Sequence, residues 1–290
     1  MLELNNIYEM DCMNGMRLLS DESAQIVIVD PPYNIGKNFG NNKDKKEFND
    51  YIEWCNLWIS ECSRILKKDG TMFIYGFSEI LSYIFVHLQL NKRWLIWHYT
   101  NKNSSACPFW QRSHESIICC WKDNRVFNQD LVREPYTDRY LKGIVGKKRT
   151  KTKGRFRNNN EDMFDGDTFF KAHKDGALPR DVIKTPALVG AYGSSERWFI
   201  CKDCGSNVFN PEFLKEHKSH NIEKHPTQKP LELCFKLINS CRQDKGYILV
   251  PFCGSGSECV AAKSLGIQYV GFELNPDYVR LSKERLRSDF

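Results

Sequence analysis

The chain has 290 residues, of which 41% are hydrophobic and 27% are charged, as is typical of a soluble globular protein. No apolar run approaches the roughly 18 residues that a membrane-spanning helix needs, and the first residues lack the pattern of a signal peptide. We therefore expect a cytoplasmic protein without a membrane partner. Its net charge of +6 favours an anionic partner only weakly.

The first 121 residues show the patterns of alternating strands and helices. An apolar run predicts a buried strand at 24–30, and apolar residues at helical spacing predict a helix from 47 to 67, with Gly70 just past its end. The next predicted elements are a strand at 71–75, a helix at 78–90 and strands at 93–99 and 116–121. Strands that alternate with helices favour a parallel sheet with helical crossovers.

Residues 122–224 lack this regularity and are rich in basic side chains. One short stretch contains Lys147, Lys148, Arg149, Lys151, Lys153, Arg155 and Arg157. Such a run can be an ordinary solvated loop, or it can contact the phosphates of a nucleic acid. The second interpretation is favoured if the flanking core acts on DNA.

After Pro230 the alternation of helices and strands returns. The predicted elements are a helix at 231–241, a strand at 247–250, a helix at 258–265, a strand at 268–273 and a helix at 277–287. The sequence therefore predicts one α/β core, formed by residues 1–121 and 225–290, that is interrupted by residues 122–224.

The tetrapeptide Asp30-Pro31-Pro32-Tyr33 closes the first buried strand. Its two prolines fix φ and remove backbone donors, so the acid and the aromatic ring are held rigidly. Ligands of open α/β sheets bind at this end of the strands. A carboxylate and a carbonyl can accept both hydrogens of an exocyclic amine while tyrosine stacks on a planar ring. The motif therefore predicts a site for an aromatic amine.

A glycine loop follows the strand predicted at 247–250. Gly254 and Gly256 let the backbone pass close to a ligand, and the next helix offers its N-terminal donors. Two glycines alone are also typical of an ordinary tight turn. However, Glu273 ends the following strand, where a carboxylate can bind ribose hydroxyls. Because the full three-glycine fingerprint of a dinucleotide site is absent, a single nucleoside cofactor is favoured over NAD.

Together, three motifs resemble those of the S-adenosylmethionine-dependent DNA amino-methyltransferases: Asp30-Pro-Pro-Tyr33, His225-Pro-Thr-Gln-Lys-Pro230 and Phe252-Cys-Gly-Ser-Gly256. Their order, with the catalytic motif first and the cofactor loop last, is that of the β class. The resemblance implies a Rossmann-like methyltransferase fold with a mostly parallel twisted sheet flanked by helices. It also implies that residues 122–224 form the target-recognition region.

The resemblance also implies roles for individual residues. Asp30 and the carbonyl of Pro31 would accept hydrogen bonds from the target amine, next to Pro32, and Tyr33 would stack on a base flipped out of the helix. Glu273 would hold the cofactor ribose, Asp11 would meet its adenine, and its methionine end would lie under His225, Thr227 and Lys229. The full set expected around the cofactor is Asp11, Cys12, Asp30, His225, Thr227, Lys229, Pro251, Phe252, Cys253, Gly254, Gly256, Ser257, Glu273 and Leu274. Val250 departs from the family, which usually has an acidic residue there.

The motif also bears on which base is modified. An acidic first residue favours N6 of adenine, whereas N4-cytosine enzymes more often carry serine there. A 5-methylcytosine enzyme would need a Pro-Cys motif, and none of the 11 prolines precedes a cysteine. We therefore expect a site-specific adenine-N6 methyltransferase of a restriction-modification system that acts on double-stranded DNA by direct transfer. Cytosine-N4 methylation is the alternative within this family.

Other partners and activities stay open at this point. A cognate restriction endonuclease and a second copy of the chain are candidate partners. RNA or protein glutamine could replace DNA as the substrate, because related motifs carry out that chemistry. A non-catalytic, zinc-containing DNA-binding subunit is the alternative of another class, with Val250 marking a degraded cofactor site.

Cys201, Cys204, His217 and His220 form a Cys-x2-Cys-x12-His-x2-His pattern within an insertion at 198–224. The segment resembles a Cys2His2 zinc finger, although the last spacing is shorter than usual. We expect a structural zinc ion here, against the alternative of reduced cysteines in a surface loop. Such an ion would rigidify the insertion without taking part in methyl transfer.

Overall fold

The computed structural model describes residues 2–39, 44–101, 108–148, 169–189, 196–205, 207–208 and 215–288. The chain divides into two compact units. One consists of Met1–Phe127 and Asp181–Phe290, and the other of Asn128–Arg180. Residues 181–224, which lie within the region of irregular sequence, therefore group with the α/β unit.

Eight strands of the described chain form the central sheet of the α/β unit. Seven run in one direction, and only β5 is antiparallel to its neighbours. This confirms the mostly parallel sheet expected from the sequence. In spatial order the strands are β1 (Asn6–Glu9), β11 (Gln268–Glu273), β10 (Tyr247–Val250), β2 (Ala24–Val29), β3 (Leu66–Gly76), β5 (His114–Trp121), β4 (Asn91–His98) and β6 (Val182–Lys184).

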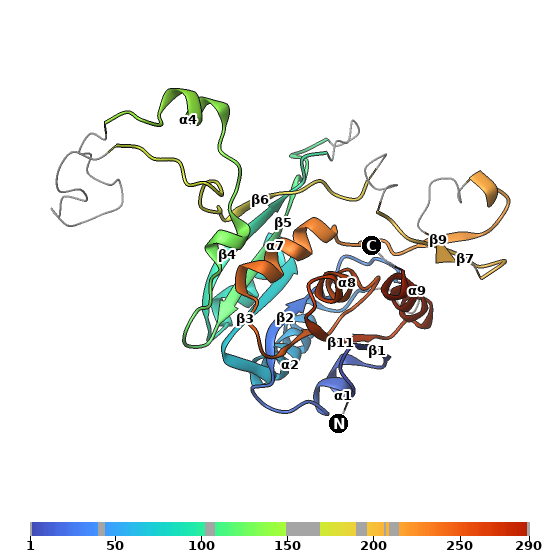
Figure 1. Ribbon diagram of the computed structural model, residues 1–290. Coiled ribbons are helices and arrows are strands. Elements are labelled where there is room, and N and C mark those ends of the chain that lie inside the picture. The colour runs from blue at the N-terminus through green and yellow to red at the C-terminus, as the bar shows by residue number, and fades with distance from the viewer. Residues whose placement is uncertain are drawn as a thin grey trace. The chain divides into compact units, whose positions relative to one another are not determined.

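Helices cover both faces of this sheet and make a three-layer α/β/α arrangement (Figure 1). In β2, Ile26 and Ile28 point to one hydrophobic cluster, whereas Val27 and Val29 point to the other. A strand buried on both faces explains the continuous apolar run of this segment. The first cluster includes α7 (Leu231–Cys241), α8 (Ser257–Ser264) and α9 (Pro276–Arg287), and the second α1 (Cys12–Met16), α2 (Phe48–Ile65) and α3 (Ser78–His87).

Several short elements lie outside the sequence predictions. Strand β1 has four residues and helix α1 has five, too few for a periodic pattern to stand out. Strand β6 lies in the region expected to be irregular and pairs with β4 at the sheet edge. The boundary between α2 and β3 falls at Ile65 and Leu66, so β3 begins earlier than the predicted strand at 71–75.

A second, smaller sheet belongs to the insertion at 198–224. In it β7 (Phe199–Cys201) pairs antiparallel with both β8 (Asn207–Val208) and β9 (Ile222–Lys224). The other unit, Asn128–Arg180, contains a 3-10 helix at Gln129–Val132 and the short helix α4 at Asp138–Gly143. Isolated antiparallel bridges join Glu134 to Ala177 and Lys148 to Phe169 within this unit.

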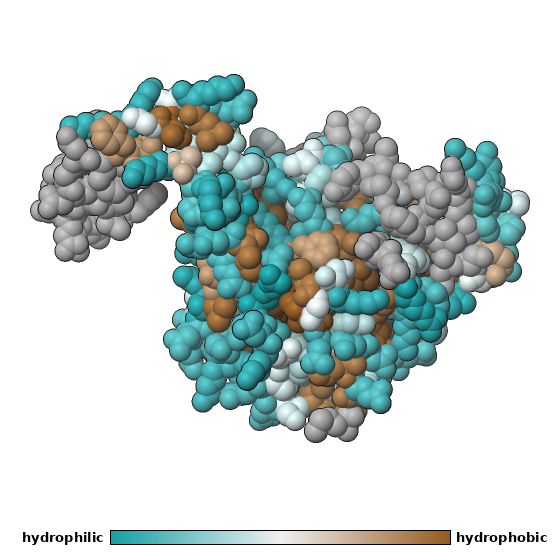
Figure 2. Space-filling model, in the orientation of Figure 1, coloured by the Kyte–Doolittle hydropathy of each residue, from teal (hydrophilic) through white to brown (hydrophobic). Residues whose placement is uncertain are grey.

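The surface is polar over most of the face drawn in Figure 2. Apolar residues are exposed there only in limited areas, as on most proteins. In the described ranges, no helix has both the length and the apolar character that crossing a membrane requires.

Candidate active site

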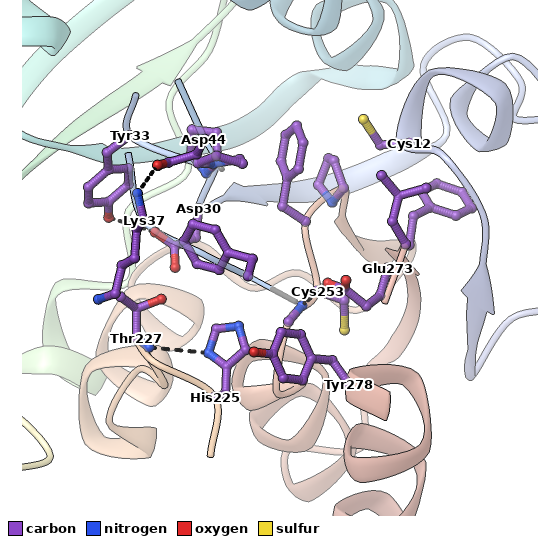
Figure 3. A pocket seen from close by; sticks show the side chains of 18 of the residues that line it. Cys12, Asp30, Tyr33, Lys37, Asp44, His225, Thr227, Cys253, Glu273 and Tyr278 are labelled. Carbon is purple, nitrogen blue, oxygen red and sulfur yellow. Dashed lines mark hydrogen bonds between the residues drawn. The ribbon is translucent and has the colours of Figure 1, made fainter. Parts of the chain in front are cut away.

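A cavity of about 520 Å³ opens beside the carboxyl ends of β2, β10 and β11. This is the edge at which an open parallel sheet binds ligands, and the volume suits a small molecule. The tetrapeptide after β2, the glycine loop after β10 and the carboxylate that ends β11 all line it. Figure 3 shows side chains from these distant segments around one space.

The tetrapeptide Asp30–Tyr33 holds its acid and its ring against this cavity. Tyr51 of α2 donates a hydrogen bond to the carbonyl of Pro32 at 2.6 Å and so fixes the turn. Tyr33 is buried, and its hydroxyl donates to Asp30 Oδ1 at 2.6 Å and to Glu115 Oε2 at 3.0 Å. Burial raises the pKa of Tyr33 well above its ordinary value, so the phenol stays a neutral donor.

Lys229 contacts the carboxylate of Asp30 directly. Its Nζ lies 2.6 Å from Asp30 Oδ2 and 3.4 Å from Glu115 Oε2, and its side chain is only 3% exposed. Tyr99 donates to the other oxygen of Glu115 at 2.8 Å. The resemblance implied that Lys229 lies at the methionine end of the cofactor; it does line the cavity, and it also forms an ion pair with the proposed catalytic acid.

The protonation of this pair follows from opposing effects. Burial opposes the charge of Lys229, but Asp30 and Glu115 outweigh it, so the pKa of Lys229 is raised and the amine stays charged. Burial and Glu115 also raise the pKa of Asp30, while Lys229 favours its ionised form. Asp30 is therefore a carboxylate that accepts a proton more readily than an exposed aspartate does.

The glycine loop is shaped by close contacts that only glycine permits. Gly254 has φ +52°, and a Cβ atom there would lie 2.7 Å from Nε2 of His225. Gly256 has φ +77° and would place a Cβ atom 2.8 Å from Cβ of Ser282. Glu273 accepts from the backbone N–H of Gly254 at 2.8 Å, which joins the loop to the end of β11. The carboxylate expected at the ribose thus also organises the loop beside it.

His225 and Tyr278 form the opposite wall, and Figure 3 shows them side by side. Their ring centroids are 4.6 Å apart in an edge-to-face contact. Burial and the nearby cations Lys229 and Arg285 lower the pKa of His225 to about 3. The imidazole is therefore neutral near pH 7, and its Nδ1 accepts from the backbone N–H of Thr227 at 3.4 Å.

The proposed adenine end is more apolar. Phe252 contacts Trp54 and Trp58 edge-to-face, with ring centroids 5.6 and 5.9 Å apart. Asp11 lines the cavity, but its Oδ1 also accepts from the N–H groups of Met13 and Asn14. Asp11 is thus the N-cap of α1, with its second oxygen left for a ligand.

Of the cofactor residues predicted from the sequence, all but Gly256 line the cavity, as do all four catalytic residues. Gly256 instead forms the left-handed turn that starts α8. The sequence assigned no role to Glu115, which lies at the start of β5. It also gave none to Tyr278, Trp54 or Glu258, which belong to ordinary helical patterns.

Glu258 is a buried carboxyl on this cavity with no assigned role. It is 4% exposed, and its Oε1 makes no hydrogen bond within the described part of the chain. Burial, reinforced by the charge of Asp30, raises the pKa of Glu258 to about 7. Its charge is therefore sensitive to pH near neutrality.

The four predicted metal ligands converge. The ligand atoms of Cys201, Cys204, His217 and His220 all lie within 4.8 Å of one another, and Cys201 Sγ is 3.2 Å from His220 Nδ1. Among the described residues this is the one such cluster of three or more His, Cys, Asp or Glu side chains. The short His-x2-His spacing fits because residues 217–220 form a turn, closed by the N–H of His220 donating to the carbonyl of His217 at 2.9 Å, which brings the two ring centroids to 4.8 Å.

The basic stretch is only partly described. Lys147 and Lys148 are exposed in the unit Asn128–Arg180. The other predicted phosphate contacts, Arg149, Lys151, Lys153, Arg155 and Arg157, lie outside the described residues.

Comparison with known proteins identifies the family. Residues 24–284 match the model of the N6_N4_Mtase family, described as DNA methylase. The chain belongs to this family. It is an S-adenosylmethionine-dependent DNA amino-methyltransferase, as the resemblance implied. The match includes the motifs around Asp30, His225 and Gly254.

Curated relatives match this methyltransferase over nearly its whole length. Type II methyltransferase M.HpaI of Haemophilus parainfluenzae is 28% identical over 97% of the chain and 73% of its own length. Type II methyltransferase M1.MboII of Moraxella bovis is 26% identical over 96% and 95%. DNA adenine methyltransferase YhdJ of Escherichia coli K12 is 25% identical over 98% and 83%.

Solved structures support the fold. The cytosine-N4-specific PvuII DNA methyltransferase has a TM-score of 0.64 and 13% identity over 98% of this chain and 86% of that one. M1.HpyAVI in complex with S-adenosylmethionine has a TM-score of 0.52 and 20% identity, covering 97% and 99%. These confirm the predicted Rossmann-like methyltransferase fold.

The cavity fits the cofactor that the family implies. Its volume of about 520 Å³ is typical of small-molecule sites. Glu273 offers carboxylate oxygens beside the glycine loop, and Phe252 and Trp54 offer aromatic surface for a purine. Val250, where the family usually has an acid, is buried at the end of β10 and is not among the lining residues.

Proposed function

We propose that this methyltransferase modifies the N6 amine of adenine in double-stranded DNA, with the base turned out of the helix. The observation that carries the proposal is the position of Asp30. Its carboxylate closes β2 and lines the same cavity as the glycine loop and Glu273. A carboxylate at that position can accept a hydrogen bond from an amine brought close to the cofactor.

The exocyclic amine of adenine is a poor nucleophile because its lone pair is delocalised into the ring. Asp30 and the carbonyl of Pro31 accept its two hydrogens, which concentrates the lone pair on nitrogen. Lys229 and Tyr33 each donate to one oxygen of Asp30, and each oxygen keeps a further lone pair for the amine. The Asp30 carboxylate, whose pKa is raised by burial, accepts the proton that the amine releases.

Bound S-adenosylmethionine supplies an activated methyl group, so the chain needs no covalent nucleophile. Tyr33 offers aromatic surface at the cavity, and Phe77 packs edge-to-face against its ring with centroids 5.0 Å apart. Stacking there would partly offset the few kcal/mol that flipping a base out of the duplex costs. Exposed Lys147 and Lys148, together with the rest of the basic stretch, are proposed to contact phosphates.

Adenine is preferred over cytosine because the motif begins with an acid, and because a relative is named a DNA adenine methyltransferase. The alternative is cytosine-N4, the specificity named for PvuII methyltransferase, which shares the fold. A non-catalytic DNA-binding subunit is disfavoured, since the cavity and its lining are complete apart from Val250. Calorimetry with S-adenosylmethionine tests the non-catalytic alternative, because a degraded cofactor site would not bind S-adenosylmethionine.

The wider setting is also part of the proposal. Several relatives are named Type II methyltransferases, which supports a role in a restriction-modification system in the cytoplasm. A cognate endonuclease and a homodimer stay predictions. We also propose a structural Zn²⁺ at the Cys2His2 cluster, because four protein ligands of this type complete a tetrahedral shell. That the insertion reads bases is a further prediction.

The decisive experiment incubates unmethylated plasmid DNA with the protein and labelled S-adenosylmethionine. Mass spectrometry of the digested nucleosides should find N6-methyladenine, and sequencing of modified bases should find it at one recognition sequence. N4-methylcytosine as the product would replace the adenine assignment with the alternative. Label in RNA or protein but not in DNA would overturn the substrate class.

A further inference from the structure

The Cys2His2 cluster is built on the same chain segments as one wall of the cofactor cavity. Strand β9 ends at Lys224, and the next residue, His225, lines the cavity. Strand β7, which pairs with β9, begins at Phe199 and ends at the metal ligand Cys201. The cluster and the wall are thus two ends of one hairpin.

At the end of this hairpin that holds the cluster, the described residues form only a small sheet. Strands β7 and β9 have three residues each, and sheets this small are marginal in water. The turn is closed by the N–H of Gly205, which donates to Cys201 at 3.0 Å. Lys202 N donates to Asn221 O at 2.9 Å, and Asn221 N donates to Asp203 Oδ2 at 2.8 Å. These contacts bring the ligands together but bury little apolar surface.

The other end of the hairpin is fastened to the core through Gln228. Its Nε2 donates to the carbonyl of Glu196 at 2.9 Å, and its Oε1 accepts from the N–H of Trp198 at 3.2 Å. Glu196 in turn accepts from the N–H of Leu231 at the start of α7. Gln228 lies between the cavity residues Thr227 and Lys229, so the base of the hairpin and the cavity share one segment.

Helix α9 makes a second connection. Trp198 and Ile200 pack against Tyr278 and Leu281 in a small buried cluster, and Lys202 forms an ion pair with Asp277. Tyr278 is also the ring that contacts His225 on the cavity wall. Strand β7 therefore packs against Tyr278, which in turn contacts His225 on the cavity wall.

We propose that a zinc ion bound by Cys201, Cys204, His217 and His220 holds the His225–Tyr278 wall in place, so that metal occupancy sets the affinity for the cofactor. The ion has no open coordination position and takes no part in the reaction. The inference rests on the proposed zinc ion and on the cofactor cavity. It does not depend on which base is methylated.

The first test measures bound metal in the purified full-length protein by mass spectrometry. One zinc per chain is expected, and Cys204→Ser and His217→Asn should lose it. His87→Asn, a change at an exposed histidine outside the cluster, is the matched control and should keep the ion. Cobalt substituted for zinc should show thiolate charge-transfer and tetrahedral absorption bands. A protein that binds neither metal when it is supplied would overturn the proposal.

The second test compares S-adenosylmethionine binding by calorimetry in zinc-loaded and chelator-stripped protein. Stripping should raise Kd about tenfold, since part of the preorganised wall is lost, and added zinc should restore it. An unchanged Kd in stripped protein that remains folded by circular dichroism would overturn the coupling.

His220→Cys keeps the proposal testable if other ligand variants fail to fold. Its thiolate can replace the imidazole nitrogen that faces Cys201, so zinc and cofactor affinity should both be kept. Loss of cofactor affinity despite bound zinc would contradict the proposed mechanism. A zinc-free chain that methylates adenine and keeps an unchanged Kd for the cofactor would remove only this inference, whereas a zinc protein that methylates cytosine would remove only the adenine assignment.

Discussion

The cofactor cavity and the Cys2His2 hairpin are both built at strand ends, but different forces hold them. The cavity sits on strands buried between two large hydrophobic clusters, so the sheet fixes where its residues lie. The hairpin and the neighbouring β8 have strands of two or three residues, and among the described residues their own buried cluster consists of Phe199 and Cys201, with Ile222 against it. We expect its geometry to depend on the proposed zinc ligation and on its contacts with α9. Substituting a cavity residue should therefore change the methylation rate or cofactor binding. Substituting a hairpin residue should instead change how well the hairpin itself is folded.

The largest effect is expected at Asp30. Asp30→Ala removes the acceptor of the target amine and should lower the methylation rate by on the order of 10³ to 10⁴, because orientation and charge stabilisation are both lost. Cofactor affinity should be nearly unchanged. Single-turnover methylation measures the rate, and calorimetry measures the cofactor affinity. Asp21→Ala, at an exposed acid, is the control, and turnover in Asp30→Ala would remove the proposed role.

The next prediction tests whether Lys229 stabilises the folded protein by compensating the buried charge of Asp30. Lys229→Met should lower the free energy of unfolding by about 3–5 kcal/mol, because it leaves the Asp30 carboxylate buried beside Glu115. Chemical denaturation measures this loss. The double variant Asp30→Asn with Lys229→Met should recover most of the stability but none of the activity. If the double variant were as unstable as Lys229→Met, the loss would come from packing rather than charge.

Glu258 offers a test by pH. Its pKa is about 7 in the folded chain, above its ordinary value of 4.5, so the folded state binds the proton more tightly. This stabilisation is fully present below pH 4.5 and is lost as pH rises to 7, a change of about 3 kcal/mol. Glu258→Gln should remove that slope and make the protein relatively more stable at pH 8. Denaturation between pH 5 and 8 checks it, and parallel curves for the two proteins would contradict it.

The core and most of the cavity could be predicted from the sequence because local signals and tertiary position agree there. The apolar run before Asp30 and the glycines before α8 each mark a strand end, and parallel strands bring such ends to one edge. The signals failed where elements were short, as for β1 and α1, or where pairing depends on distant segments, as for β6 at the sheet edge.

The missed site residues had no local signal that distinguished them. Glu115 acts through Tyr33, which is 82 residues away. Lys229 was predicted among the cofactor residues, but its contact with Asp30 spans 199 residues and had no local signal. Tyr278 and Trp54 fit ordinary helical patterns, so only the folded chain brings them to the cavity. In contrast, the spacing of Cys201, Cys204, His217 and His220 is itself a signal, and the fold brings these four side chains together as a candidate metal site.

The smallest effect tests how closely the wall and the glycine loop fit. Gly254→Ala should destabilise the protein by about 1–2 kcal/mol, because alanine is strained at φ +52°. The added Cβ would also lie 2.7 Å from His225 and push the imidazole off the loop, so cofactor affinity should fall about tenfold.

Gly143→Ala is the matched control for this change. Gly143 ends α4, and a Cβ atom there would meet no described residue within 4 Å, so stability and cofactor affinity should both be kept. The two readouts of Gly254→Ala also separate two causes. A stability loss without an affinity loss would mean that the strain stays in the loop and that His225 does not shape the cofactor site. A loss of both stability and cofactor affinity would indicate that His225, and the hairpin that leads into it, help to position the cofactor.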